Sequence, residues 1–387
     1  MNKKFLWMLA AGHLFTDMNQ GALPAILPFL IAAGGLSYAD AAGLTFAVAL
    51  SSSVIQPLFG IWADRVSKSW LMPVGILMAG CGLSLTGLLH GHYWLMFMVA
   101  VLSGIGIAAF HPEAARMANQ LAGKKKGGGM SVFSVGGNIG FAFGPAAATP
   151  AMLYLGLSGS LVLAVPALAM FVILMRQSAR MREGALAMAE GKNFSSVSAS
   201  ENEWGKFIWL TVAVVGRSVI FHNLNTFLPL YWTNVLGQSR AAGGTMLTLM
   251  FVVGAVSTFI GGHLADRFGT NKIVKIGWVL LIPSLFLFSR VSSPAVAAAL
   301  LLLTACSLFT VTTPMIVLGQ RYLPGRLGFA SGVTLGLGVS VGGIVAPFVG
   351  KYADVNGLTA AFQMLAFLPL LGAFVTLTLR KPKMEQG

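Results

Sequence analysis

The sequence is poor in charged residues. Of its 387 residues only 9% are Asp, Glu, Lys or Arg, whereas 56% are hydrophobic, and the mean hydropathy is +0.80. A water-soluble fold of this length could not cover its surface with so few charges. The composition therefore excludes a soluble globular protein and predicts a membrane protein.

Cysteine is almost absent as well. The two cysteines, Cys81 and Cys306, both lie in apolar segments, which excludes a disulfide framework and a paired-cysteine metal site. The chain also lacks a phosphate-binding loop and any arrangement of Ser, His or Cys typical of an active site. We therefore expect no enzyme activity, no cofactor and no metal. Any work that the protein performs must draw on an ion gradient.

Apolar segments fill most of the chain. About twelve of them are long enough to cross a hydrocarbon layer of roughly 30 Å as helices. The first begins like a signal peptide but continues too far and has no convincing cleavage site, so we interpret it as a retained helix. The predicted fold is all-α, with twelve transmembrane helices at 5–33, 40–62, 71–90, 93–118, 129–152, 155–175, 207–235, 242–264, 272–290, 294–319, 327–350 and 357–379.

Acidic residues are scarcer than basic ones, and the net charge is +14. Nearly all Lys and Arg fall in alternate loops on the side of the N-terminus, and the opposite side receives only Arg240, Arg290 and Lys351. This asymmetry is typical of cytoplasmic loops and predicts that both termini are cytoplasmic in an inner-membrane protein. The excess charge then contacts anionic lipid headgroups, and no nucleic-acid partner is expected.

Two halves of the chain repeat each other. A polar stretch at 176–206 divides six predicted helices from six, which predicts bundles at 1–175 and 207–387 joined by a cytoplasmic linker. The segments 60–65, 16–24 and 144–145 return about 200 residues later, at 262–267, 221–229 and 346–347. Two homologous six-helix bundles are the plan of a secondary transporter, with its solute site between the halves near the membrane midplane.

The loop after the second predicted helix, GIWADRVSK, resembles the loop signature of the major facilitator superfamily, and GGHLADRFGTNK repeats it between helices eight and nine. The resemblance implies the major facilitator fold. Glycine permits close helix approach, while the acidic and basic residues can cap a helix or pair with charges. We expect a cytoplasmic gate latch, with solvated turns as the alternative. Its residues would be Gly60, Asp64, Arg65, Asp266 and Arg267.

The fifth predicted helix contains glycines at a spacing of four residues, and this run of glycines ends at Gly144-Pro145. Gly140 and Gly144 lie on one face, which permits tight packing, and Pro145 can kink the helix. The run resembles the fifth-helix signature of proton-coupled exporters in the superfamily, which implies a gating role. Plain helix packing is the alternative.

Within the superfamily, several stretches resemble the family of fosmidomycin resistance proteins. They are GHLFTDMNQGALPAILPFL, SSSVIQPLFGIWADR, GIGIAAFHPEAARMA, SVFSVGGNIGFAFGP and LPGRLGFASGV, and they are spread over most of the chain. The resemblance implies a proton-driven drug exporter of the inner membrane. One departure is that Ala100 occupies the position where such exporters usually carry an arginine in helix four, which moves the coupling role to other charges.

Ionisable residues inside apolar helices are the candidates for proton coupling. Asp17 lies about a dozen residues into the first helix, where a carboxylate must be protonated, paired or hydrated. His13 lies one turn earlier and can reach it. His111 and Glu113 flank Pro112 in the fourth helix, and Arg116 shares a helical face with Glu113. The residues predicted to couple protons are Asp17, His13, His111 and Glu113, and Arg116 is predicted to act in gating. Alternatively, Glu113 and Arg116 are interfacial residues.

The seventh helix supplies candidates for substrate binding. Arg217 can bind phosphonate or carboxylate oxygens with its planar fork, and His222 falls at the position related to Asp17 by the repeat. Polar residues that could bind substrate or merely link helices complete the set: Asn19, Gln20, Asn225 and Trp232.

Together these features predict a proton-coupled antiporter that exports small toxic molecules by alternating access. Its partners would be a small-molecule substrate, protons and membrane lipids, and a monomer is expected. An importer, a proton symporter for an organic acid or a sugar, stays open. A membrane-embedded enzyme or scaffold is disfavoured because the loops are too short to hold a catalytic domain.

Overall fold

The computed structural model describes residues 2–65, 69–122, 126–189, 202–323, 330, 333–334 and 338–379. Within these ranges it leaves out the side chains at 57, 60–65, 119, 126–128, 130–131, 186–189 and 338–340. The described chain is all-helical and contains no strand, which confirms the predicted class. It forms two compact units, Met1–Phe194 with Arg240–Thr248, and Ser195–Ser239 with Leu249–Gly387.

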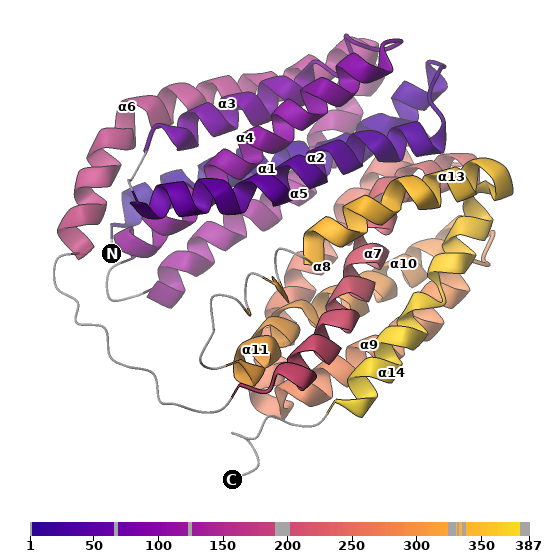
Figure 1. The fold of residues 1–387 in the computed structure, drawn as a ribbon. Coiled ribbons are helices and arrows are strands. Elements are labelled where there is room, and N and C mark those ends of the chain that lie inside the picture. Colours follow the sequence, from indigo (N-terminus) through magenta and orange to yellow (C-terminus); the bar gives the residue numbers. More distant parts are fainter. Residues whose placement is uncertain are drawn as a thin grey trace. The chain divides into compact units, whose positions relative to one another are not determined.

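The described residues of the first unit form seven helical elements and the start of α8 (Arg240–Phe268) (Figure 1). The seven are α1 (Lys3–Ala32), α2 (Tyr38–Arg65), α3 (Leu71–Ser84), α4 (Tyr93–Leu121), α5 (Lys126–Leu155), the 3-10 helix η1 (Gly156–Leu163) and α6 (Ala164–Ala189). The second unit contains α7 (Trp204–Asn234), most of α8, α9 (Thr270–Phe288), α10 (Pro294–Thr310), α11 (Thr312–Tyr322), α13 (Gly338–Leu365) and α14 (Leu368–Thr378).

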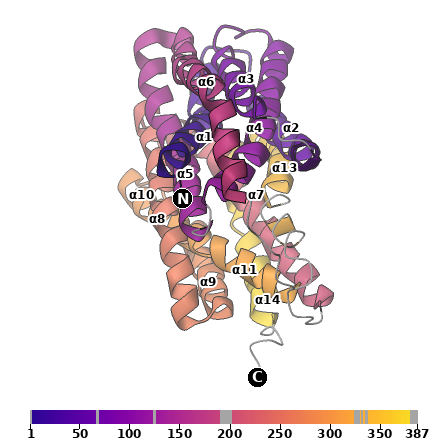
Figure 2. The ribbon, with the colours of Figure 1, turned by 90° about the vertical axis from the view of Figure 1, so that its left-hand side faces the viewer.

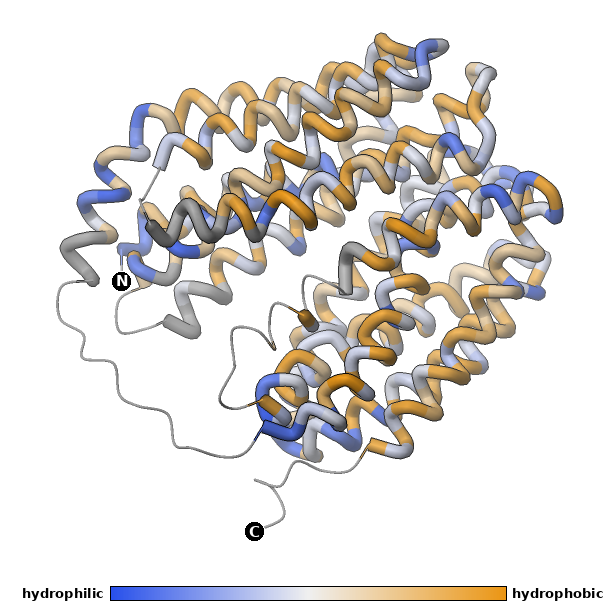
Figure 3. The backbone as a smooth tube through the Cα atoms, viewed as in Figure 1, coloured by the Kyte–Doolittle hydropathy of each residue, from blue (hydrophilic) through white to orange (hydrophobic). Residues whose placement is uncertain are grey.

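The helices are apolar enough to cross a membrane. Eight segments of the described chain have the length and hydropathy of membrane spans, and three of them, Val132–Ala185, Pro294–Tyr322 and Val341–Thr378, contain more than one helix. The shorter apolar α3 and the 30-residue α1 lie outside these eight segments. Figure 3 shows hydrophobic residues along the helices and hydrophilic residues gathered mainly near helix ends. Backbone hydrogen bonds inside each helix make this arrangement stable in lipid.

Glycines let α1 and α5 pack backbone to backbone. The two helices lie side by side in both views (Figure 1 and Figure 2). A Cβ atom at Gly136, Gly140 or Gly144 would collide with the α1 carbonyls of Ala10, Leu14 or Met18. The four-residue spacing of these glycines therefore forms the contact face, as a small-residue stripe does between membrane helices. This contact brings the backbone of α5 against polar side chains of α1.

The second unit repeats this pairing with α7 and α13. The backbone N–H of Gly342 on α13 donates a hydrogen bond to Ser218 Oγ on α7 at 3.0 Å. A Cβ atom at Gly342 would lie 2.7 Å from Cδ2 of His222. The sequence repeat thus corresponds to a repeated close contact, in which a glycine of one helix faces polar side chains of the other.

The helix bounds differ from the predicted spans at several breaks. The span 71–90 ends as an α-helix at Ser84, and 294–319 divides into α10 and α11 at Val311. Gly357, with φ of 84°, interrupts the continuous run of α13. The helix α6 also continues to Ala189, into the stretch predicted as a linker, because the segment ARMREGALAMA is rich in strong helix formers.

Candidate functional site

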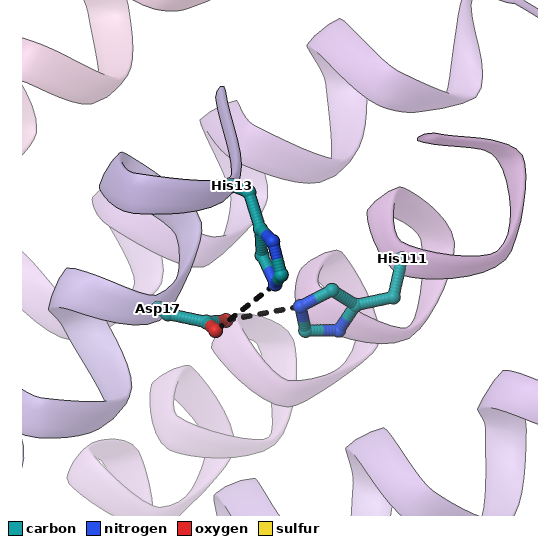
Figure 4. A group of neighbouring side chains, drawn as sticks. All are labelled: His13, Asp17 and His111. Carbon is teal, nitrogen blue, oxygen red and sulfur yellow. Dashed lines mark hydrogen bonds and ion pairs between the residues drawn. The ribbon is translucent and has the colours of Figure 1, made fainter. Parts of the chain in front are cut away.

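Three ionisable side chains meet inside the first unit (Figure 4). The carboxylate of Asp17 on α1 lies 3.1 Å from Nε2 of His13, one turn earlier, and 2.9 Å from Nε2 of His111 on α4. The side chain of Asp17 is only 7% exposed, and those of His13 and His111 are 13% and 17% exposed. The predicted His13–Asp17 contact is therefore present, and His111 joins it from a helix about a hundred positions away.

The backbone of α5 fixes the orientation of His13. Its Nδ1 lies 2.8 Å from the carbonyl oxygen of Phe133, and its ring stacks on the Phe133 ring with centroids 4.2 Å apart. A carbonyl oxygen can only accept, so Nδ1 of His13 carries a hydrogen and donates it. The facing pair, Nε2 of His13 and Oδ2 of Asp17, must then share one further proton to form a hydrogen bond. That proton makes either an imidazolium–carboxylate pair or a neutral imidazole with a carboxylic acid.

The same three side chains form a potential metal-ligand set. Two imidazole nitrogens and one carboxylate oxygen lie within 4.8 Å of one another. Such donors suit divalent transition metals. Both carboxylate oxygens, however, already have a nitrogen at 2.9 or 3.1 Å, which is hydrogen-bond geometry. The cluster as it stands is an acid–base network, and an ion would have to replace those contacts.

Gly137 closes one side of the cluster. A Cβ atom there would lie 2.6 Å from Asp17 Oδ2, 2.6 Å from His13 Nε2 and 2.5 Å from His13 Cε1. The backbone of Gly137 therefore packs directly against His13 and Asp17, the two side chains that share a proton. Because α5 occupies this side, solvent cannot approach the pair across it.

Glu113 pairs with Arg116. Its side chain is fully buried, and Arg116, one turn later on α4, reaches both carboxylate oxygens, at 2.7 Å to Oε1 from Nη2 and 3.2 Å to Oε2 from Nε. The structure thus pairs Glu113 with Arg116, as the spacing predicted. The sequence pattern had grouped His111 with Glu113 and Arg116. In the structure, His111 contacts Asp17 instead.

Replacing Arg116 with Ala is expected to destabilise the protein by about 3 kcal/mol, because it leaves a buried carboxylate without its cation. The purified Arg116→Ala protein should therefore melt several degrees lower. Adding Glu113→Gln to that variant should recover part of the loss, since a neutral amide is less costly to bury. An Arg116→Ala protein that melts like the parent would show that the pair contributes little.

The predicted substrate residues of α7 have contrasting surroundings. Arg217 is half-buried and donates to Thr312 Oγ1 of α11 at 3.5 Å, and no carboxylate of the described residues lies within ion-pair distance of it. Asn225 is buried with its Oδ1 lacking a hydrogen-bond partner in the described structure. His222 is also buried, with its ring against Phe221. Trp232 is 2% exposed in an aromatic core that includes Phe288.

Two polar candidates follow Asp17 on α1. Asn19 is buried and donates from Nδ2 to the carbonyl of Phe15 at 2.8 Å. Its Oδ1 has no partner among the described residues. Gln20 is half-buried. Asn223 of α7 makes the same kind of bond, from its Nδ2 to the carbonyl of Val219 at 2.8 Å.

The predicted gating residues are described only in part. The side chains of Gly60, Asp64 and Arg65 lie outside the described residues. In the repeated motif, Asp266 and Arg267 are exposed at the end of α8, where the guanidinium of Arg267 lies over the ring of Phe268 at 5.2 Å. Gly140, Gly144 and Pro145 are buried at the α1–α5 contact.

Sequence reasoning missed two residues of the cluster. Phe133 acts through its backbone carbonyl and its ring, and Gly137 acts through the absence of a side chain. The glycine run of the fifth helix was the only available signal for Gly137. Nothing in the sequence singles out a backbone carbonyl.

Comparison with known proteins agrees with the fold. A family model described as Major Facilitator Superfamily matches residues 9–347 and 210–386. An uncharacterized MFS-type transporter of Bacillus subtilis, YfnC, is 30% identical over 97% of this chain and 92% of its own length. The fosmidomycin resistance protein of Escherichia coli is 28% identical over 95% of this chain and 90% of its own.

Solved structures give the same fold at low sequence identity. A bacterial homologue of the human lysosomal transporter Spinster, in an inward-facing and occupied conformation, matches with a TM-score of 0.81 at 15% identity, over 99% of this chain and 97% of that one. The nucleoside transporter NupG matches with a TM-score of 0.75 at 14% identity, over 97% and 99%.

Proposed function

Because the chain belongs to the Major Facilitator Superfamily of membrane transporters, we propose that it is a proton-coupled antiporter that exports small toxic or antibiotic molecules across the inner membrane. The observation that carries the proposal is the buried contact of Asp17 with His13 and His111. The name of the Escherichia coli relative, a fosmidomycin resistance protein, and that of the Klebsiella pneumoniae multidrug resistance protein MdtG, 24% identical, support export as the direction.

The cluster is suited to coupling because one proton changes its net charge by one unit inside a membrane. Charge in a low dielectric is expensive, so the loaded and unloaded clusters favour different surroundings. In the proposed cycle a proton from outside loads the cluster and substrate leaves. The loaded carrier then opens to the cytoplasm, where proton release prepares the site for the next substrate molecule.

Transport into everted membrane vesicles tests this proposal. Their interior corresponds to the outside of the cell, so an antiporter should accumulate fosmidomycin when the interior is made acidic. A protonophore should abolish the accumulation. Accumulation driven instead by an acidic exterior would establish the alternative, a proton symporter.

Arg217 supplies the proposed recognition of the substrate. A half-buried guanidinium with no carboxylate of the described residues in ion-pair range can be compensated by an anionic group of the substrate. We expect Arg217→Gln to raise the KM for an anionic substrate at least tenfold, and Arg217→Lys to raise it less. The uptake assay in vesicles measures both. Equal KM values for the parent and Arg217→Gln would remove Arg217 from the binding site.

A further inference from the structure

The two histidines of the cluster contact one carboxylate but have different surroundings. His13 is enclosed by α5: its Nδ1 donates to the carbonyl of Phe133, its face stacks on the Phe133 ring, and its Nε2 edge lies against Gly137. All of its hydrogen-bonding positions are therefore taken by protein groups. Its ring cannot exchange the Nδ1 hydrogen with water without breaking a buried hydrogen bond.

His111 has an unoccupied nitrogen. Its Nε2 meets Oδ1 of Asp17 at 2.9 Å, and its ring packs edge-on against His13 at 5.0 Å. In the part of the chain that the structure describes, no hydrogen bond to its Nδ1 occurs. Figure 4 shows this second nitrogen turned away from the carboxylate, and the side chain is the most exposed of the three, at 17%.

We infer that His111 exchanges the coupled proton with water and that α5 holds His13 as the stationary partner of Asp17. The inference rests on the proposed proton coupling and assigns separate roles to the two imidazoles. Phe133 is then a positioning residue that acts through His13. Gly137 is one that acts on both His13 and Asp17, since a Cβ atom there would also lie 2.6 Å from Asp17 Oδ2. Pro112 follows His111 and cannot donate a helical hydrogen bond, which loosens α4 next to the exchanging ring.

The transfer is balanced within the cluster. The proton shared with His13 stays on Nε2 of His13, so Asp17 begins as a carboxylate. Neutral His111 begins with its hydrogen on Nε2, donated to Oδ1 of Asp17, and a proton from water binds at Nδ1. The Nε2 hydrogen then passes to Oδ1 of Asp17, which leaves a carboxylic acid and a neutral His111 with its hydrogen on Nδ1. Release runs in reverse: the acid returns its proton to Nε2, and the Nδ1 proton departs to water.

Other ionisable groups near this path are few. Among the described residues, α1 brings His13 and Asp17 to His111, and α4 carries Glu113 and Arg116 as a pair of their own. The described parts of α2, α3, α5 and α6 add no histidine, cysteine or carboxylate to the three-residue group. Of the two described groups that contact Asp17, His111 is the more exposed.

Chemical labelling tests the difference in access without any transport. Purified protein in detergent is treated with diethyl pyrocarbonate, and peptide mass spectrometry follows the modification of each histidine. We expect His111 to react at least tenfold faster than His13. Equal rates, or faster modification of His13, would overturn the inference even if proton-coupled export is established.

Substitution by glutamine tests the roles in transport. A glutamine amide can replace the Nε2 contact with Asp17 but cannot be protonated. We expect His111→Gln to lower acid-driven accumulation in everted vesicles at least tenfold, and His13→Gln to lower it no more than threefold. The control is His263→Gln, which changes an exposed histidine of α8 whose Nδ1 lies 3.0 Å from the Phe259 carbonyl.

The outcomes separate this inference from the proposed function. Equal losses in the two variants, or a greater loss in His13→Gln, would overturn the division of roles while leaving proton coupling intact. Absence of acid-driven accumulation in the parent protein would contradict the proposed function itself. Size-exclusion profiles matching that of the parent confirm that each variant is folded.

Discussion

Replacing Asp17 with Asn should lower acid-driven substrate accumulation at least tenfold and leave substrate exchange across the membrane within about threefold of the parent. The amide keeps the size of the side chain and can still bond to one histidine, but it cannot take up the proton that His111 delivers to Oδ1. Exchange of labelled for unlabelled substrate needs no net proton movement. The two assays in the same vesicles therefore separate coupling from binding.

A matched control uses Asp40, a described aspartate of the same unit that lies outside the cluster. Asp40 bonds to the backbone N–H and the hydroxyl of Ser37 near the start of α2, away from the cluster. Asp40→Asn should leave both assays close to the parent. An Asp17→Asn protein that still accumulates substrate in response to pH would exclude Asp17 as a proton carrier.

Replacing Gly137 with Ala should lower acid-driven accumulation at least tenfold. The added methyl would lie 2.5–2.6 Å from His13 and Asp17, so the pair must separate or α5 must move away from α1. Overpacking of this kind also destabilises, by about 1–3 kcal/mol. Substrate accumulation is measured at several pH values. Separation of His13 from Asp17 should change the pH dependence of accumulation as well as its rate.

Gly205 is the matched control for this substitution. It is also a helical glycine, at the start of α7, and a Cβ atom there would meet nothing within 4 Å. Gly205→Ala should leave transport unchanged and leave stability the same or slightly higher, since alanine favours helix. Normal transport with an unshifted pH profile in Gly137→Ala would show that close contact of α5 is unnecessary for coupling.

The sequence predicted the helices and the local contacts but not the breaks between them. Hydropathy located the spans because each must fill the membrane, and the four-residue spacing was enough to pair His13 with Asp17. The break at Val311 and the early end of α3 at Ser84 lie within apolar runs. Hydropathy is the same on both sides of such breaks and cannot locate them.

The complete cluster could not be predicted, because its remaining contacts are tertiary. His111 is 94 positions from Asp17, and the local pattern of α4 gave it Glu113 and Arg116 as neighbours instead. The bond from His13 to Phe133 uses a backbone carbonyl, which every residue has. Only the packing of α5 on α1 decides which carbonyl reaches the imidazole.

The direction of proton movement during transport distinguishes antiport from symport. The protein is reconstituted into liposomes that contain a pH-sensitive dye, and fosmidomycin is added outside. We expect the lumen to become more alkaline as substrate enters, because antiport moves protons outward whichever way the protein is inserted. Acidification of the lumen would establish symport, and an unchanged lumenal pH during substrate entry would contradict proton coupling altogether.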